Sequence, residues 1–202
     1  MIAAIGRTFR EGVEEVGRAG GFVAESAGAS RDVGTWLPRV TMHARMLGVD
    51  SLPIALFIAL FTGIVLALLA SYSITGAVPL YFVGTLVEKT ITMELAPVLT
   101  GLALAGRVGA NIAAELGTMR VTEQIDALET LSYDPYAYLV VPRVIAGTVM
   151  FPIVVGLAMV VGVAAAGMAS VLLLDLPAAE FVKGVRRFFD PFDVRYGVVT
   201  TP

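Results

Sequence analysis

Two long stretches of this chain contain no charged residue at all. One runs from Ser51 to Val87 and the other from Val144 to Leu174. Each is longer than the ~20 apolar residues that a helix needs to cross a bilayer. The chain as a whole is 57% hydrophobic and only 15% charged. The pattern therefore predicts an all-α integral membrane protein.

We expect about three transmembrane helices in the chain. They cover Leu52–Ala70, Leu95–Ala114 and Val144–Leu174. A turn is expected at 71–79, where glycine and proline occur. The apolar piece Leu80–Val87 is too short to cross alone, so we predict a re-entrant or interfacial segment. Glu88 and Lys89 then mark contact with water.

The third predicted span and the segment after it contain their own packing signals. Gly156, Gly162 and Gly167 suit close approach to another helix. Residues 178–189 mix apolar and basic side chains and predict a short amphipathic helix. Asp190-Pro191 ends that helix, and a new segment begins there.

The first fifty residues are predicted to form a separate region of amphipathic helices. Within 1–28, apolar residues recur at steps of three or four, which is typical of a helix lying in the membrane interface. A helix packed on another protein subunit is the alternative. A second amphipathic segment, 36–47, places Trp36 beside Arg39 as an interfacial anchor. His43 is likewise expected to be an interfacial side chain.

Small residues recur at every fourth position along the second predicted span. They are Gly101, Ala105, Gly109, Ala113 and Gly117. Residues four apart lie on one face of a helix, so this face forms a ridge almost without side chains. Such ridges allow two helix backbones to approach closely in a bilayer. The ridge therefore predicts tight helix packing.

Residues 118–131 are polar but keep Val121, Ile125 and Leu128 at helical spacing. This pattern predicts a short amphipathic helix outside the lipid. Gly117 is expected to end the membrane helix and Thr118 to cap the next one. An ordinary solvated loop helix is the alternative reading.

Two charged residues belong to the second predicted span. Glu94 lies at its start, where a carboxylate favours the positive end of the helix dipole. Arg107 lies inside the span, and charged groups there are costly in free energy. We expect its long side chain to reach the lipid headgroups or to form an ion pair with another helix.

Several classes of protein are disfavoured by the composition. A net charge of −3 argues against nucleic-acid binding, and the lack of cysteine excludes disulfides and thiolate metal sites. With a single histidine, no metal site and no cofactor is expected. The spans hold no paired aspartates, histidine cluster or serine–lysine arrangement, which disfavours an enzyme. No GxxxxGK[ST] phosphate loop occurs, so ATP chemistry would belong to another subunit.

The region 94–143 resembles the MlaE/YrbE permease family, the membrane subunits of ABC systems that move phospholipids or related lipids. The matching stretches are ELAPVLTGLALAGRVGANIAAELGTM, VTEQIDALE and DPYAYLVVPRVIA. The likeness extends more loosely from Trp36 to the end, so 51–202 is expected to be the permease domain. Family members have five transmembrane helices, which implies two more after Pro202.

The resemblance also implies partners and a location. The segment 118–131 matches the family's cytoplasmic coupling helix, which docks into a separate ATPase subunit. The residues expected to make that contact are Thr118, Arg120, Val121, Glu123, Ile125, Asp126 and Leu128. The protein is expected to work as a homodimer in a bacterial inner membrane, together with an Mce-domain lipid-binding protein.

The lipid pathway is also expected from the resemblance. Glu94 matches a glutamate near the mouth of the family's lipid pocket. This chain has Met93 where many members have arginine, and Ala96 where they have glycine. We therefore expect selection mainly through acyl chains, with Leu95, Val98 and Leu102 contributing one wall. A non-transporting membrane scaffold for an ATPase is the main rival, and a membrane-embedded lipid enzyme is the lesser one.

Overall fold

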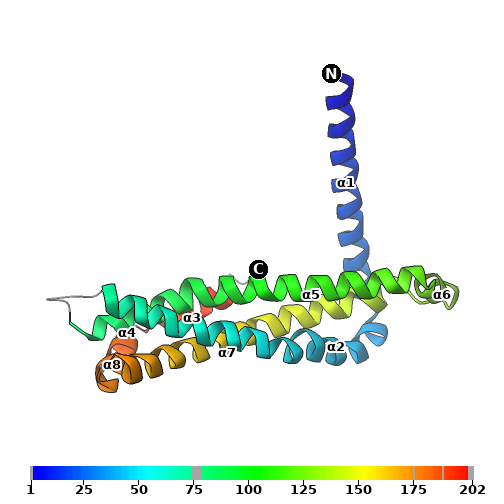
Figure 1. The fold of residues 1–202 in the computed structure, drawn as a ribbon. Helices are drawn as coiled ribbons and strands as arrows, with labels where there is room; N and C mark the ends of the chain where they lie inside the picture. Colours follow the sequence, from blue (N-terminus) through cyan, green and yellow to red (C-terminus); the bar gives the residue numbers. More distant parts are fainter. Residues whose placement is uncertain (1, 74–78, 175, 188, 200–202) are drawn as a thin grey trace. The chain divides into compact units, whose positions relative to one another are not determined.

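The structure is a computed structural model that describes residues 2–73, 79–174, 176–187 and 189–199, with side chains from Val13 onward. Every regular element in these residues is helical, which confirms the all-α prediction (Figure 1). The α-helices are α1 Ile2–Ala29, α2 Val33–Leu47, α3 Leu52–Ser73, α4 Tyr81–Thr90, α5 Ala96–Val121, α6 Gln124–Thr130, α7 Val141–Leu173, α8 Ala178–Arg187 and α9 Pro191–Val199. A 3₁₀ turn, η1, covers Val49–Ser51, and two π-helical segments cover Ile91–Leu95 (η2) and Tyr136–Val140 (η3).

Three helical stretches of the described residues are long and apolar enough to cross a membrane. They are Val33–Ser73, Tyr81–Val121 and Tyr136–Leu173. This confirms the predicted number, but each stretch begins earlier than expected. The short segments η1 and η2 join the preceding helix to the apolar one, and η3 adds a helical turn before α7. The expected turn at 71–79 falls mostly outside the described residues.

The chain forms two compact units. Unit 1 contains Met1–His43 and Leu116–Ala146, and unit 2 contains Ala44–Glu115 and Gly147–Pro202. Each unit therefore combines two segments that are distant in the sequence. The boundary expected near residue 50 separates interfacial helices from the permease domain and stays a prediction.

The core of unit 2 depends on small residues of α3. Ala55, Ala59, Gly63 and Ala67 are buried and recur at every fourth position. A methyl group on Gly63 would overlap the carbonyl oxygen of Gly162 in α7. Gly162 also contacts Ile91, since its added Cβ would lie 3.2 Å from Cγ2 of that side chain. The prediction that Gly162 supports close packing is thus confirmed, and α3 supplies the matching surface.

Helices α4 and α8 pack closely against each other (Figure 1). Gly84 lies against the backbone of Phe181, and Gly184 lies against the backbone of Tyr81. The hydroxyl of Thr85 donates a 3.0 Å hydrogen bond to the carbonyl of Gly184. Residues 178–187 therefore form the expected helix, and its buried glycine face packs on another helix.

Helix α4 corrects the prediction for residues 80–89. It is not a separate re-entrant piece, because it continues through η2 into α5. Glu88 does not mark contact with water, since it is 2% exposed. Lys89 forms an ion pair with Asp193 of α9, which is also buried. Sequence periodicity does not detect this pairing, because the partner lies more than a hundred positions along the chain.

Candidate functional site

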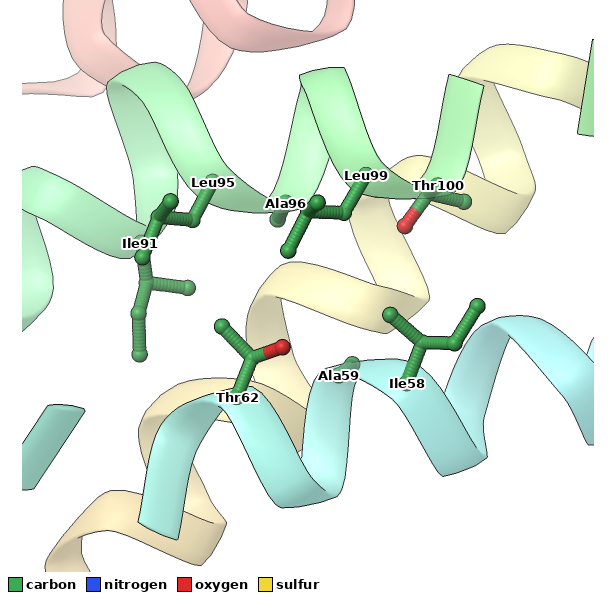
Figure 2. A pocket seen from close by; sticks show the side chains of 8 residues that line it. All are labelled: Ile58, Ala59, Thr62, Ile91, Leu95, Ala96, Leu99 and Thr100. Carbon is green, nitrogen blue, oxygen red and sulfur yellow. The ribbon is translucent and has the colours of Figure 1, made fainter. Parts of the chain in front are cut away.

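A narrow apolar cleft lies between α3 and the η2–α5 helix (Figure 2). Side chains from the two sides point toward one another across it. The cleft is lined by Ile58, Ala59, Thr62, Ile91, Leu95, Ala96, Leu99 and Thr100. Its free volume is about 10 Å³, which is roughly the space for one water molecule. In a single chain the cleft is therefore a packed interface and is too small for an acyl chain.

The structure separates the three residues predicted to share a lipid-facing wall. Leu95 lines the cleft toward α3, whereas Val98 is 60% exposed and Leu102 is 71% exposed. Leu95 lies four positions before Leu99, which also lines the cleft, so these two share one side of the helix. Val98 and Leu102 share the neighbouring, exposed side. One lipid-facing wall made by all three residues therefore stays a prediction.

Glu94 also lies in a different setting from the one expected. It belongs to η2, inside a helical stretch that begins at Tyr81. Its backbone N–H is thus not at a helix start, and the argument from the helix dipole was wrong. Its side chain is exposed, as are Val98 and Leu102. These three side chains follow one another at steps of four along the exposed side of the helix.

The small-residue ridge of α5 is largely uncovered. Gly101 is buried, but Ala105, Gly109 and Ala113 are exposed. A Cβ added to Gly106 or Gly109 would have nothing within 4 Å among the described atoms. Tight packing on this ridge therefore stays a prediction, and it would need a helix from outside the described residues.

Among the residues that the structure describes, Arg107 is bound to backbone and not to an acidic side chain. Its guanidinium donates a hydrogen bond to the carbonyl oxygen of Asp50 in η1. A carbonyl at the start of a helix usually accepts a hydrogen bond from the next turn of the same helix. Here the carbonyl of Asp50 also accepts one from Arg107, which links α5 to η1. The expected ion pair is thus replaced by a link from α5 to the beginning of α3.

The junction between α5 and α6 lies six residues later than predicted. Helix α5 continues through Gly117 and Thr118 and ends at Val121. The prediction that Gly117 ends the membrane helix and Thr118 caps the next one was therefore wrong. The reversal occurs at Glu123, whose φ of 57° lies in the left-handed region. Such a conformation is uncommon for a residue with a side chain, so the bend is sharply defined.

Hydrogen bonds mark both sides of α6, at the end of α5 before it and at its own C-terminal end. The hydroxyl of Thr122 donates to the carbonyl of Thr118 at 2.8 Å. At the other end, Ser132 has a φ of 60°. The N–H of Tyr133 donates to the carbonyl of Leu128, and that of Ser132 donates to Glu129. These two bonds form the Schellman motif that closes many helices.

The predicted coupling residues are only partly brought together. Arg120 and Asp126 form a 2.6 Å ion pair across the bend, and both remain more than half exposed. Ile125 and Leu128 are half-buried, while Val121 is 85% exposed. Val121 precedes the bend, so it does not continue the stripe of α6. Leu131, 68% exposed just after α6, was missed, although its apolar character and its position three residues beyond Leu128 would have suggested it.

The rest of unit 1 supports the segment after α6. Phe22 of α1 makes an edge contact with Tyr136, with 5.7 Å between ring centroids. The guanidinium of Arg39 lies 3.4 Å from the ring centroid of Tyr138. The indole N–H of Trp36 donates to the carbonyl of Ser30 at 2.8 Å. His43 is 3% exposed, so its expected place as an interfacial side chain was wrong.

Comparison with known proteins gives a consistent result. The family described as Permease MlaE matches residues 40–202. A probable ABC transporter permease protein of Rickettsia conorii is 41% identical over 164 residues, covering 81% of this chain and 63% of the relative. One from Synechocystis is 44% identical over 149 residues, covering 74% of this chain and 57% of the relative.

A more distant relative has a more specific name. The intermembrane phospholipid transport system permease protein MlaE of Haemophilus influenzae is 32% identical over 163 residues, covering 81% of this chain and 62% of the relative. The chain thus spans less than two thirds of the length of these relatives. The match over residues 40–202 confirms the resemblance seen in the sequence. The chain belongs to the MlaE permease family.

Proposed function

We propose that this chain is the membrane subunit of an ABC transporter that moves phospholipids or related lipids between membranes. The names of its relatives support a permease of an ABC system, and the Haemophilus relative supports phospholipid as the substrate class. ATP would be hydrolysed by a separate subunit, since the chain lacks a phosphate-binding loop. A second copy of the chain and an Mce-domain protein are further proposed partners.

The observation that carries the proposal is the bend between α5 and α6. Helix α5 runs unbroken from Ala96 to Val121, and α6 follows after two residues. The left-handed Glu123 and the Arg120–Asp126 ion pair fix the direction in which α6 leaves. A movement imposed on α6 by a bound ATPase would therefore be transmitted to the membrane part of α5, because no flexible linker between the two helices would absorb it.

The proposed lipid pathway follows the exposed side of α5. In a homodimer, the ridge that contains Ala105 and Gly109 would face the second copy. Val98 and Leu102 would then contribute apolar surface for acyl chains, with Glu94 beside them. Movement of α5 would widen or narrow the space between the copies. The cleft toward α3, where Leu95 lies, would act as a packed support for this movement.

The docking of the ATPase can be tested by charge substitution on α6. The double variant Ile125→Asp/Leu128→Asp places two carboxylates on the apolar side of the helix. We expect the ATPase subunit to be lost on purification, because one desolvated apolar anchor contributes about 2 kcal/mol or more. Ala127→Asp/Thr130→Asp adds the same charge on the opposite side of α6 and should retain the ATPase.

Folding must be separated from docking in this test. Ile125 and Leu128 are half-buried, so their replacement also perturbs unit 1. Val121→Asp avoids this problem, because Val121 is 85% exposed, and it should weaken ATPase binding in a protein that still elutes as a single species. Normal co-purification with both Val121→Asp and the double variant would exclude residues 118–131 as the docking segment.

The scaffold alternative makes a different prediction. A chain that only anchors an ATPase would bind it through α6 but would move no lipid. ATP-dependent transfer of labelled phospholipid between vesicles by the assembled complex distinguishes the two functions.

A further inference from the structure

An open apolar groove lies between the end of α7 and helix α8. It is lined by Met168, Val171 and Leu172 of α7 and by Ala178, Phe181 and Val182 of α8. Gly167 forms part of the floor of the groove, and the ring of Phe181 packs closely against it. A Cβ added to Gly167 would lie only 3.0 Å from Cε1 of Phe181. The groove exists because Gly167 has no side chain and Phe181 turns inward.

This groove is much larger than the cleft between α3 and α5. Its free volume is about 340 Å³, compared with about 10 Å³ for that cleft. One water molecule needs roughly 10–15 Å³ of such free volume, so the groove is far larger than the space for a single water molecule. Methylene groups are of similar size, and a groove lined only by apolar side chains suits a stretch of acyl chain.

The groove is next to a concentration of positive charge. Lys183, Arg186 and Arg187 of α8 are all exposed, although the chain as a whole has a net charge of −3. The Nζ of Lys183 lies 3.4 Å from Oε1 of Glu180, and the carboxylate offsets the charge of the lysine. Arg187 lies over the ring of Tyr81, 5.3 Å from its centroid. These two cations already have partners within the chain.

Arg186 has no such partner among the residues that the structure describes. It follows Val182, a lining residue of the groove, by one helical turn, so the two lie on neighbouring positions of one face. Arginine binds phosphate oxygens through a planar set of donors. An apolar groove one turn away from an available arginine matches a phospholipid, with its chain in the groove and its phosphate at the guanidinium.

We propose that this groove holds one acyl chain of an anionic phospholipid whose headgroup is bound by Arg186. The site lies apart from the exposed face of α5, and its occupancy does not depend on transport. It would attach a lipid molecule to α8 at the end of the third span. The proposal therefore stands even if the transport function is wrong.

The test measures which lipids stay bound to the purified protein. The protein, extracted with its partners from membranes, is incubated with micelles that contain equal amounts of phosphatidylglycerol and phosphatidylcholine with identical chains. Native mass spectrometry then counts each bound lipid. Both lipids carry a phosphate that Arg186 could bind, but the choline cation of phosphatidylcholine offsets the negative charge of its phosphate. We therefore expect retention of phosphatidylglycerol to exceed that of phosphatidylcholine by about tenfold.

Matched variants separate the groove from the headgroup site. Val182→Trp fills the groove and should remove both lipids, whereas Val160→Trp places the same ring on an exposed part of α7 outside the groove and should remove neither. Arg186→Gln should abolish the preference for phosphatidylglycerol but leave some of each lipid bound. Lys183→Gln should keep the preference, because Glu180 already offsets that charge.

Three results would overturn the proposal. The first is equal retention of both lipids by the unmodified protein. The second is a lipid count that Val182→Trp leaves unchanged. The third is a groove occupied by polypeptide, detected when a photoreactive group at position 182 crosslinks to protein and not to lipid.

Discussion

Gly63 of α3 and Gly162 of α7 lie against each other with no side chain between them. A methyl group on Gly63 would overlap the carbonyl oxygen of Gly162. Close backbone contact of this kind is how membrane helices associate, since the apolar lipid gives no hydrophobic drive for it. The contact thus fixes the distance between the first and third spans in unit 2.

Gly63→Ala should destabilise the protein because the overlap is with backbone, which cannot turn aside. Overpacking of this kind costs about 1–3 kcal/mol. Gly156→Ala is the matched control on α7, since a Cβ there would meet nothing within 4 Å. Thermal unfolding of the two variants in detergent would show the difference. Equal melting temperatures would mean that α3 and α7 do not pack through Gly63.

The ion pair between Lys89 and Asp193 should stabilise the attachment of α9. Asp193 is 4% exposed, so Asp193→Asn leaves the Lys89 cation without its partner. The cost should be about 1–3 kcal/mol, below the value for a fully buried pair, because the Lys89 side chain is 34% exposed. Lys89→Met/Asp193→Leu should be less destabilised than Asp193→Asn alone.

The exposed pair Lys183–Glu180 is the control for this prediction. Glu180→Gln should change stability by well under about 1 kcal/mol, as is usual for surface pairs. Thermal unfolding in detergent measures all three variants. If Asp193→Asn were as stable as the unmodified chain, Lys89 and Asp193 would not be paired in the membrane.

Much of this architecture could be predicted from charge alone. The two stretches without charge located the first and third spans, and the apolar run Leu95–Ala114, interrupted only by Arg107, located the second. Asp190-Pro191 correctly marked a helix boundary, where the Asp190 carboxylate accepts the N–H of Phe192 at 2.9 Å. The ends of the spans were harder to predict from the sequence. The π segment Ile91–Leu95 has no sequence signal of its own, and it makes α4 and α5 parts of one helical stretch.

Other features depend on partners that are distant in the sequence, and one has a recognisable sequence pattern. Glu88 and Lys89 looked exposed because Asp193, which covers Lys89, lies 104 positions away. Gly117 looked like a helix end, yet an isolated glycine costs a helix only about 1 kcal/mol, and the bend occurs at Glu123 instead. The buried stripe at Ala55, Ala59 and Gly63 has the same four-residue spacing as the ridge on α5 and could have been found from the sequence.

Gly109→Leu tests whether a second copy packs on the ridge of α5. A side chain at Gly109 has open space within the chain, so the variant should fold and insert normally. If the ridge faces another protomer, leucine should separate the two copies or lock the assembly in one state. Size-exclusion chromatography and ATPase activity of the complex would report both effects. An unchanged dimer with unchanged activity would show that the ridge faces lipid.

Leu102→Ala tests the lipid-facing side of α5. Leu102 is 71% exposed, so the change opens no cavity in the core and any change in bound lipid would be direct. We expect a shift in the acyl chains that co-purify, whereas Glu94→Gln should leave the chain types largely unchanged. Leu99→Ala, in the cleft toward α3, is the control and should lower stability more than it changes the lipids. A lipid profile altered only by Glu94→Gln would mean that the headgroup is recognised.

The central claim is that movement of α6 drives lipid through the space beside α5. The most direct test is ATP-dependent transfer of a labelled phospholipid between two vesicle populations, catalysed by the complete complex reconstituted with its ATPase. The unmodified complex should transfer lipid only when ATP is hydrolysed, and Val121→Asp should reduce transfer together with ATPase binding. Ala127→Asp/Thr130→Asp should leave both intact. ATPase binding and lipid transfer that both Val121→Asp and Ile125→Asp/Leu128→Asp leave unchanged would contradict the account, as would an intact complex that hydrolyses ATP and transfers no lipid.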